Sequence, residues 1–124
     1  MPGKQEFLKL NLVKRSGKGH FRVFSFEDHG HIISYLPSLN LSAYAETKEE
    51  ALKILVEVVL KDFFENLMQC SENKVFEELK SLGWVRNKIL TRELSNNTHI
   101  DEKGILKNFN LSEETKIEEQ LVEA

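Results

Sequence analysis

The sequence predicts one α+β domain, in which an antiparallel meander of about four strands is packed by one long helix and a second, shorter helix. Polar and apolar residues alternate with a period of two through the first third of the chain, and short turns interrupt them. The apolar residues then recur at helical spacing over 48–68 and over 72–82. With 124 residues, 40% of them hydrophobic, the chain is long enough to bury a core of its own.

Four segments have the pattern of strands: residues 7–13, 21–27, 31–36 and 39–46. Glycine-containing turns at 14–19 and 28–30 join the first three, so we expect two consecutive hairpins. Pro37 ends the third strand because proline has no N–H for a ladder hydrogen bond. We expect the fourth strand to lie at an edge of the sheet.

The long helix begins at a capping box, in which the Thr47 hydroxyl and the Glu50 carboxylate satisfy each other's backbone N–H groups. Its apolar arc is wider than one sheet face requires, which favours contact with a second helix or a partner subunit. Ser71 is placed to cap the second helix, and Gly83 is placed to end it.

The weaker patterns after Gly83 predict a division into an α+β domain over 1–83 and a C-terminal extension over 84–124. The extension is expected to contain a short strand over 84–90, a hairpin over 98–109 and an acidic helix over 112–122. We expect it to pack on the same domain.

Composition indicates a soluble cytoplasmic protein that does not bind membranes. A lone cysteine, Cys70, cannot form an intramolecular disulfide. The N-terminus alternates charge with leucine and lacks the apolar stretch of a signal peptide. Charged residues interrupt the longest apolar region, over 51–68, and a transmembrane helix needs about 20 mostly apolar residues.

One basic cluster surrounds the first turn, at Lys14, Arg15, Lys18 and Arg22. Residues 1–35 have a net charge of +3, and the remainder has −6. The cluster is a candidate contact for the phosphates of a nucleic acid, and the alternative is a solvated hairpin tip. The overall charge of −3 is more acidic than a general nucleic-acid binder should be.

Few residues of the sequence are candidates for metal binding or catalysis. His29 and His31, beside Asp28, resemble a pair of metal ligands, and His20 or His99 would have to supply the third ligand of such a site. The alternative is that they are ordinary polar residues of a turn. Cys70 is expected to be a small packing residue rather than a reactive thiol. The turn over 16–19 lacks the spacing of a phosphate-binding loop. We therefore expect a protein without enzymatic activity, metal or cofactor.

Residues 21–67 resemble the N-terminal domain of HicB-type antitoxins. In that family a strand ends in an aromatic-Phe-Pro-Asp-Leu segment, and a Thr-x-Glu-Glu-Ala motif opens the helix. Tyr-Leu-Pro-Ser-Leu at 35–39 and Thr-Lys-Glu-Glu-Ala-Leu at 47–52 hold those places here. The family's Pro-Gly-Cys and Gly-Asp are replaced by Asn-Leu-Ser at 40–42 and Ala-Glu at 45–46. Residues 84–124 resemble neither of the DNA-binding units, helix-turn-helix or ribbon-helix-helix, in which such proteins often end.

The resemblance implies a protein-binding domain that neutralises a small, basic, RNA-cleaving toxin through an exposed sheet edge and an acidic surface. Homodimerisation through the apolar helix or an edge strand is expected alongside this role. The sequence also allows two alternatives to this function. One is a nucleic-acid-associated protein that uses the basic hairpin 14–22, and the other is an accessory or structural protein.

Overall fold

The structure is a computed structural model that describes residues 6–90, 92–96 and 102–123. These residues form seven strands: β1 (Glu6–Asn11), β2 (Ser16–Asp28), β3 (His31–Leu36), β4 (Leu41–Ala45), β5 (Trp84–Arg86), β6 (Glu93–Asn96) and β7 (Glu118–Glu123). All pair antiparallel in one sheet of order β4-β3-β2-β1-β6-β5, and β7 pairs with β2 outside this order. The predicted α+β class is confirmed, although the sheet has seven strands where about four were expected.

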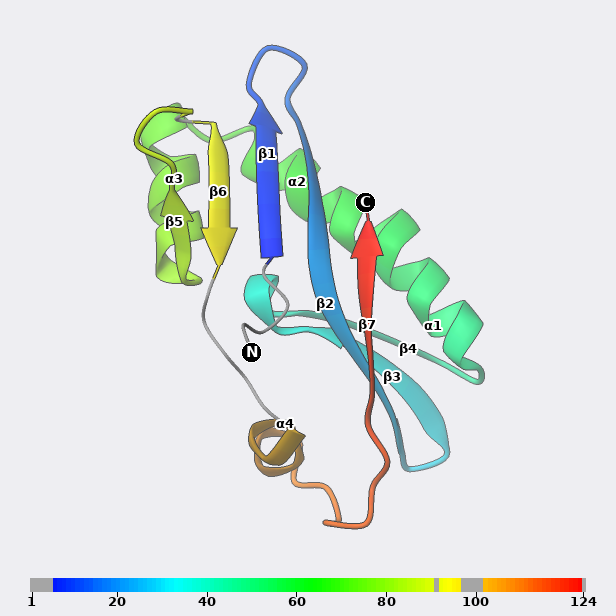
Figure 1. The fold of residues 1–124 in the computed structure, drawn as a ribbon. Helices are drawn as coiled ribbons and strands as arrows, with labels where there is room; N and C mark the ends of the chain where they lie inside the picture. Colours follow the sequence, from blue (N-terminus) through cyan, green and yellow to red (C-terminus); the bar gives the residue numbers. More distant parts are fainter. Residues whose placement is uncertain (1–5, 91, 97–101, 124) are drawn as a thin grey trace.

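Most of the helices lie on one face of the sheet. They are α1 (Lys48–Ile54), the π-helical segment η2 (Leu55–Leu60), α2 (Lys61–Leu67), α3 (Glu72–Ser81) and α4 (Glu102–Asn108). Figure 1 shows α1, α2 and α3 on one side of the sheet, and α4 near one end of the other side. The face turned away from α1, α2 and α3 is called the outer face below. No helix in the described parts of the chain is long and apolar enough to span a membrane.

The predicted long helix is confirmed as α1, η2 and α2 in continuous succession. At its start, the Glu50 N–H donates to the Thr47 hydroxyl across 3.2 Å. Its fully buried apolar positions are Ala51, Leu55, Leu60, Phe64 and Leu67. The five-residue step from Leu55 to Leu60 spans η2, because a π turn contains more residues than an α turn. The π segment therefore keeps both halves of the helix in contact with the sheet.

The predicted second helix is confirmed as α3. Its first turn is capped by the Ser71 hydroxyl, which accepts from the Lys74 N–H at 3.3 Å. Gly83 follows the helix with a φ of 94°, a conformation that glycine adopts without strain. The chain then enters β5 at Trp84, whose buried indole N–H donates to the Ser38 carbonyl across 2.9 Å. This bond links β5 to the segment that follows β3.

That segment explains why β4 begins later than predicted. Pro37–Leu39 forms a single turn of 3-10 helix after β3. Asn40 then takes a left-handed conformation with φ of 53°, and its N–H donates to the Pro37 carbonyl. Asparagine tolerates this conformation better than most residues. β4 consequently runs over Leu41–Ala45, and it lies at the end of the sheet order, as expected for an edge strand.

The short strand predicted over 84–90 is confirmed in part as β5, whereas the predicted hairpin and acidic helix are wrong in their described parts. Helix α4 occupies much of the expected hairpin, and residues 98–101 of that hairpin lie outside the described residues. The expected acidic helix over 112–122 is instead an extended segment that ends in β7. Strands β5 and β6 join the sheet through β1, and β7 joins it through β2. No break in the sheet therefore falls at the predicted division after residue 83.

Strand β2 separates two apolar cores. Phe21 and Val23 point into the larger core beneath α1, α2 and α3. Phe24 and Phe26 reach the smaller core on the outer face, where Ile105 of α4 is fully buried against them. Because α4 packs at this end, it covers only part of the outer face. Near β5, β6 and β1, no described helix lies over that face (Figure 1).

Candidate functional site

The predicted basic cluster is divided in the structure. Lys14, Arg15 and Lys18 are exposed at and beside the turn between β1 and β2. Arg22 lies farther along β2 and is only 8% exposed. The exposed members of the predicted cluster are therefore confined to the tip of the β1–β2 hairpin and the residues beside it.

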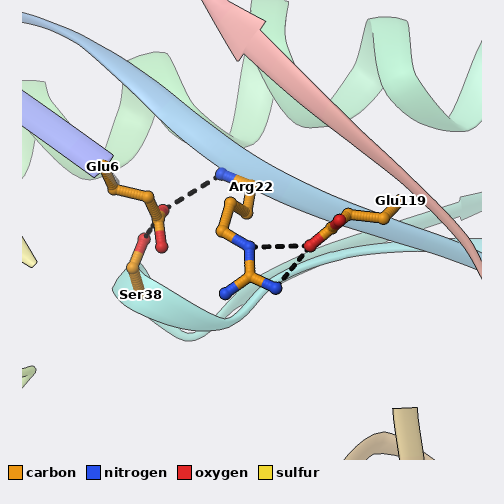
Figure 2. Close-up of polar contacts among 4 residues, drawn as sticks. All are labelled: Glu6, Arg22, Ser38 and Glu119. Carbon is orange, nitrogen blue, oxygen red and sulfur yellow. Dashed lines mark hydrogen bonds and ion pairs between the residues drawn. The ribbon is translucent and has the colours of Figure 1, made fainter. Parts of the chain in front are cut away.

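Arg22 is engaged within the fold. Its Nε donates to Glu119 Oε1 across 2.7 Å, and its Nη2 donates to the same oxygen. The guanidinium also lies 5.1 Å from the centre of the Phe24 ring, a cation–π arrangement. Figure 2 shows Arg22 between Glu119 of β7 on one side and Glu6 at the start of β1 on the other. Arg22 is therefore removed from the candidate phosphate contacts, and its position between apolar residues was the available sequence signal.

Glu6 is a buried carboxylate that the sequence analysis did not single out. Its Oε2 accepts from the Arg22 backbone N–H at 3.0 Å and from the Ser38 hydroxyl at 2.6 Å. Burial raises the pKa of Glu6, although both hydrogen bonds and the Arg22 charge act in the opposite direction. The carboxylate joins β1, β2 and the turn after β3 at one point (Figure 2). Every polar contact it makes is internal, which indicates a structural role.

The histidine pair lies at the turn between β2 and β3. His29 Nδ1 is 2.6 Å from Asp28 Oδ1, and His31 Nδ1 is 3.3 Å from the His29 carbonyl oxygen. His20, one proposed third ligand, lies at the far end of β2 opposite Phe7. His99 is outside the described residues. The described part of the chain contains no group of three side chains arranged to hold a metal ion.

Cys70 departs from expectation. It was expected to be a packing residue, but it is exposed just after α2. The helix ends at Leu67, so Cys70 falls in the turn that leads to Ser71 instead of on the buried stripe.

The first surface available to a ligand is the acidic edge, defined as strand β4 with its neighbouring carboxylates Glu27, Asp28, Glu46, Glu49 and Glu50. Tyr44 of β4 is 70% exposed on the outer face and contacts the His31 ring, with 5.7 Å between ring centres. Lys48, the basic residue among these acids, is paired with Glu118. Beside the turn at Asp28, a hollow of about 680 Å³ is also lined by Glu114.

The second surface is the outer-face hollow, a depression of about 940 Å³ over β5, β6, β1 and the start of β2. Its lining includes Phe7, Lys9, Lys18, His20, Val85, Glu93, Ser95 and Glu123. One row of directly paired residues crosses it in the order Val85, Ser95, Phe7, His20 and Glu123. It therefore combines apolar, cationic and acidic side chains on one open part of the sheet.

No protein-family model, curated protein or solved structure matches this chain. The two surfaces are the features of the described structure that bear on function. They lie at opposite ends of β2, since the acidic edge adjoins Asp28 and the hollow adjoins Lys18 and His20.

Proposed function

We propose that this chain is a non-enzymatic protein-binding domain, similar in role to HicB-type antitoxins, and that its acidic edge binds a small, basic, RNA-cleaving toxin. The main support is the geometry of β4, an edge strand with an exposed tyrosine and flanking carboxylates. We place this activity in the cytoplasm, where the RNA substrates of such a toxin are found.

The backbone of β4 offers a means of attachment. Within the described residues β3 is its one strand neighbour, so its other edge presents N–H and C=O groups to solvent. Such an edge can accept a strand from another chain, and the main-chain hydrogen bonds then contribute affinity. Its five residues are long enough for a short added strand.

Side chains around β4 supply selectivity. Tyr44 offers a large apolar surface with a polar end, the type of residue that is enriched at the energetic centres of interfaces. The carboxylates of the acidic edge would attract a basic partner and repel acidic ones. An RNA-cleaving protein is expected to be basic because it binds a polyanion.

We place homodimerisation on the helix and not on β4. Two copies of the acidic edge would bring like charges together, which is unfavourable. Ile54 and Val58 lie on the outward side of α1 and η2, with 38% and 51% of their surfaces exposed. Four residues apart on a helix, they form one small apolar patch. Val58→Glu should then shift a dimer to a monomer in sedimentation equilibrium, and an unchanged mass would contradict this placement.

The toxin-binding proposal is tested by photocrosslinking in native cells. A photoreactive phenylalanine analogue placed at Tyr44 should capture one small basic protein, and the product should survive RNase treatment. The same analogue at Glu77, an exposed position of α3 away from the acidic edge and from the Ile54 and Val58 patch, is the control. The captured protein is then purified, and its cleavage of RNA is measured with and without this chain.

Charge reversal distinguishes the acidic edge from other acidic surfaces. Glu46→Lys/Glu49→Lys/Glu50→Lys should weaken binding of the captured protein at least tenfold and abolish inhibition of RNA cleavage. The control Glu65→Lys/Glu77→Lys/Glu78→Lys makes the same change in net charge at exposed positions elsewhere. Equal weakening by both variants, or equal crosslinking from both positions, would contradict the proposal.

A further inference from the structure

We propose that the outer-face hollow binds single-stranded RNA, with a base stacked on Phe7 and the adjacent phosphates held by Lys9 and Lys18. This site lies at the opposite end of β2 from the acidic edge, and the inference does not depend on the proposed toxin-binding function.

Strand pairing places these side chains together. Phe7 lies directly opposite His20, and Lys9 lies directly opposite Lys18. Directly paired residues of antiparallel strands share a face, and so do alternate residues of one strand. The intervening Leu8 is buried in the core beneath the helices. Phe7, Lys9, Lys18 and His20 therefore form one cluster on the outer face.

The lysine pair favours an anionic ligand, although Glu93, directly opposite Lys9 on its other side, offsets part of the repulsion between the two lysines. Like charges directly opposite each other in a sheet are destabilising. Within residues 6–90, 92–96 and 102–123, neither Lys9 nor Lys18 forms an ion pair. Lys14 and Arg15, exposed at the adjoining turn, extend the positive surface beyond the hollow. A phosphate between the two ammonium groups would relieve their repulsion.

Phe7 supplies a surface for stacking. Half of it is exposed (51%), an unusual condition for a phenylalanine in the middle of a sheet. Its neighbours in the cross-strand row are Ser95 and His20, and Val85 lies beyond Ser95. An aromatic ring beside cationic side chains is the combination that single-strand-binding proteins use, with stacking and phosphate contacts contributing separately.

The remaining polar groups favour RNA over DNA. The Ser95 hydroxyl and the His20 ring lie on either side of Phe7, within reach of a sugar attached to a stacked base. A 2′-hydroxyl can donate to or accept from such groups. Glu93 and Glu123 lie at opposite margins of the hollow, where they can accept hydrogen bonds from the 2′-hydroxyl or base amino groups. Both acids repel phosphate, and because Glu93 lies directly opposite Lys9, phosphate is favoured on the Lys18 side of the lysine pair.

The test is fluorescence anisotropy with a labelled ten-nucleotide RNA of mixed, non-self-complementary sequence and with DNA of the same sequence. The wild-type chain should bind the RNA with a Kd of about 1–100 µM at 50 mM salt and bind the DNA at least threefold more weakly. Lys9→Gln/Lys18→Gln should weaken RNA binding and reduce the slope of log affinity against log salt by about 1.4, since each phosphate contact contributes about 0.7 for single strands. Phe7→Ala should weaken binding roughly 5- to 150-fold.

A matched control is available on the helix. Lys53→Gln/Lys61→Gln removes the same charge from exposed positions. This variant should not alter the affinity for RNA. Circular dichroism establishes that each variant is folded. The inference is overturned if the wild type shows no saturable binding of RNA, or if it binds DNA as tightly as RNA. It is also overturned if both lysine double variants have equal effects, or if folded Phe7→Ala binds RNA as tightly as the wild type.

Discussion

Arg22 and Glu119 are separated by 97 residues in the sequence, yet two guanidinium nitrogens of Arg22 donate to one carboxylate oxygen of Glu119. Their side chains lie diagonally across the pairing of β2 with β7, in which Arg22 is opposite Leu121 and Glu119 is opposite Phe24. The ion pair thus attaches the last strand of the chain to the centre of the sheet. It also accounts for the burial of an arginine among apolar residues.

Removal of the Glu119 charge should destabilise the fold. Glu119→Gln leaves the buried Arg22 guanidinium without its ion-pair partner, and the Glu6 carboxylate then remains nearby as an acid. Breaking a fully buried pair costs about 3–5 kcal/mol, but the Glu119 side chain is 27% exposed, so we expect a loss of about 2 kcal/mol. Urea denaturation measures this change. Glu123→Gln, on the same strand at an exposed position, should alter stability by less than about 0.5 kcal/mol; equal losses would contradict the role given to Arg22.

Glu6 should make stability depend on pH in an unusual direction. Burial raises its pKa above the ordinary value of 4.5, so the folded state binds this proton more tightly than the unfolded chain does. The contribution of Glu6 to the free energy of unfolding is therefore greatest below pH 4.5 and falls as the pH rises through the raised pKa. Relative to Glu6→Gln, the wild type should lose stability as the pH rises above 4.5. A difference that grows with pH would contradict this sign.

A second variant separates the charge of Glu6 from its hydrogen bonds. Glutamine retains an oxygen that can accept from the Arg22 N–H and the Ser38 hydroxyl, whereas alanine leaves both buried donors without that acceptor. Glu6→Ala should thus be less stable than Glu6→Gln by about 2 kcal/mol at pH 7. Urea denaturation of both variants in the same buffer measures the difference. Equal stability would mean that water or another group satisfies the donors.

Local signals predicted the parts of the fold that depend on neighbouring residues. Thr47 and Ser71 were recognised as helix caps because each is followed by a helical apolar pattern. The alternation of Leu8 and Leu10 with polar residues correctly indicated a half-buried strand. The turn at 28–30 and the break at Pro37 were likewise visible as local features.

Long-range pairing explains the errors. Residues 118–123 contain several glutamates that suit an exposed helix, but their partners on β2 lie nearly a hundred residues earlier. Sheet pairing at that distance leaves no local periodic signature, and tertiary context overrides the local preference. Ile105 similarly fell within the hairpin predicted over 98–109, whereas burial against Phe24 and Phe26 stabilises α4.

The candidate surfaces were only partly predictable. Lys14, Arg15 and Lys18 were identified as exposed basic residues, but the sequence could not show that Arg22 is paired with Glu119. Lys9 was included only as part of the predicted strand over 7–13. Its position directly opposite Lys18 depends on the register of β1 against β2, which a one-residue shift would change.

Gly19 should be intolerant of any side chain. A Cβ added there would lie 2.4 Å from the backbone oxygen of Phe7 and 2.7 Å from the Phe21 ring. Because a backbone atom cannot move aside easily, Gly19→Ala should destabilise the fold by about 1–3 kcal/mol. Gly30→Asn is the control, since nothing lies within 4 Å of its added Cβ and asparagine tolerates its positive φ. Thermal unfolding of both variants tests this, and a Gly19→Ala protein as stable as the control would contradict the close approach of β1 and β2.

Replacing one member of the lysine pair should stabilise the fold. Lys18→Glu places opposite charges across β1 and β2 where Lys9 and Lys18 now repel each other. We expect a gain of about 0.2–1 kcal/mol at low salt, which should shrink as added salt screens the exposed charges. Lys14→Glu, the same change at an exposed turn position without a strand partner, should give a smaller gain. Urea denaturation at 20 mM and 500 mM salt distinguishes the two variants. Equal gains, or a gain that is independent of salt, would mean that the repulsion between Lys9 and Lys18 does not limit stability.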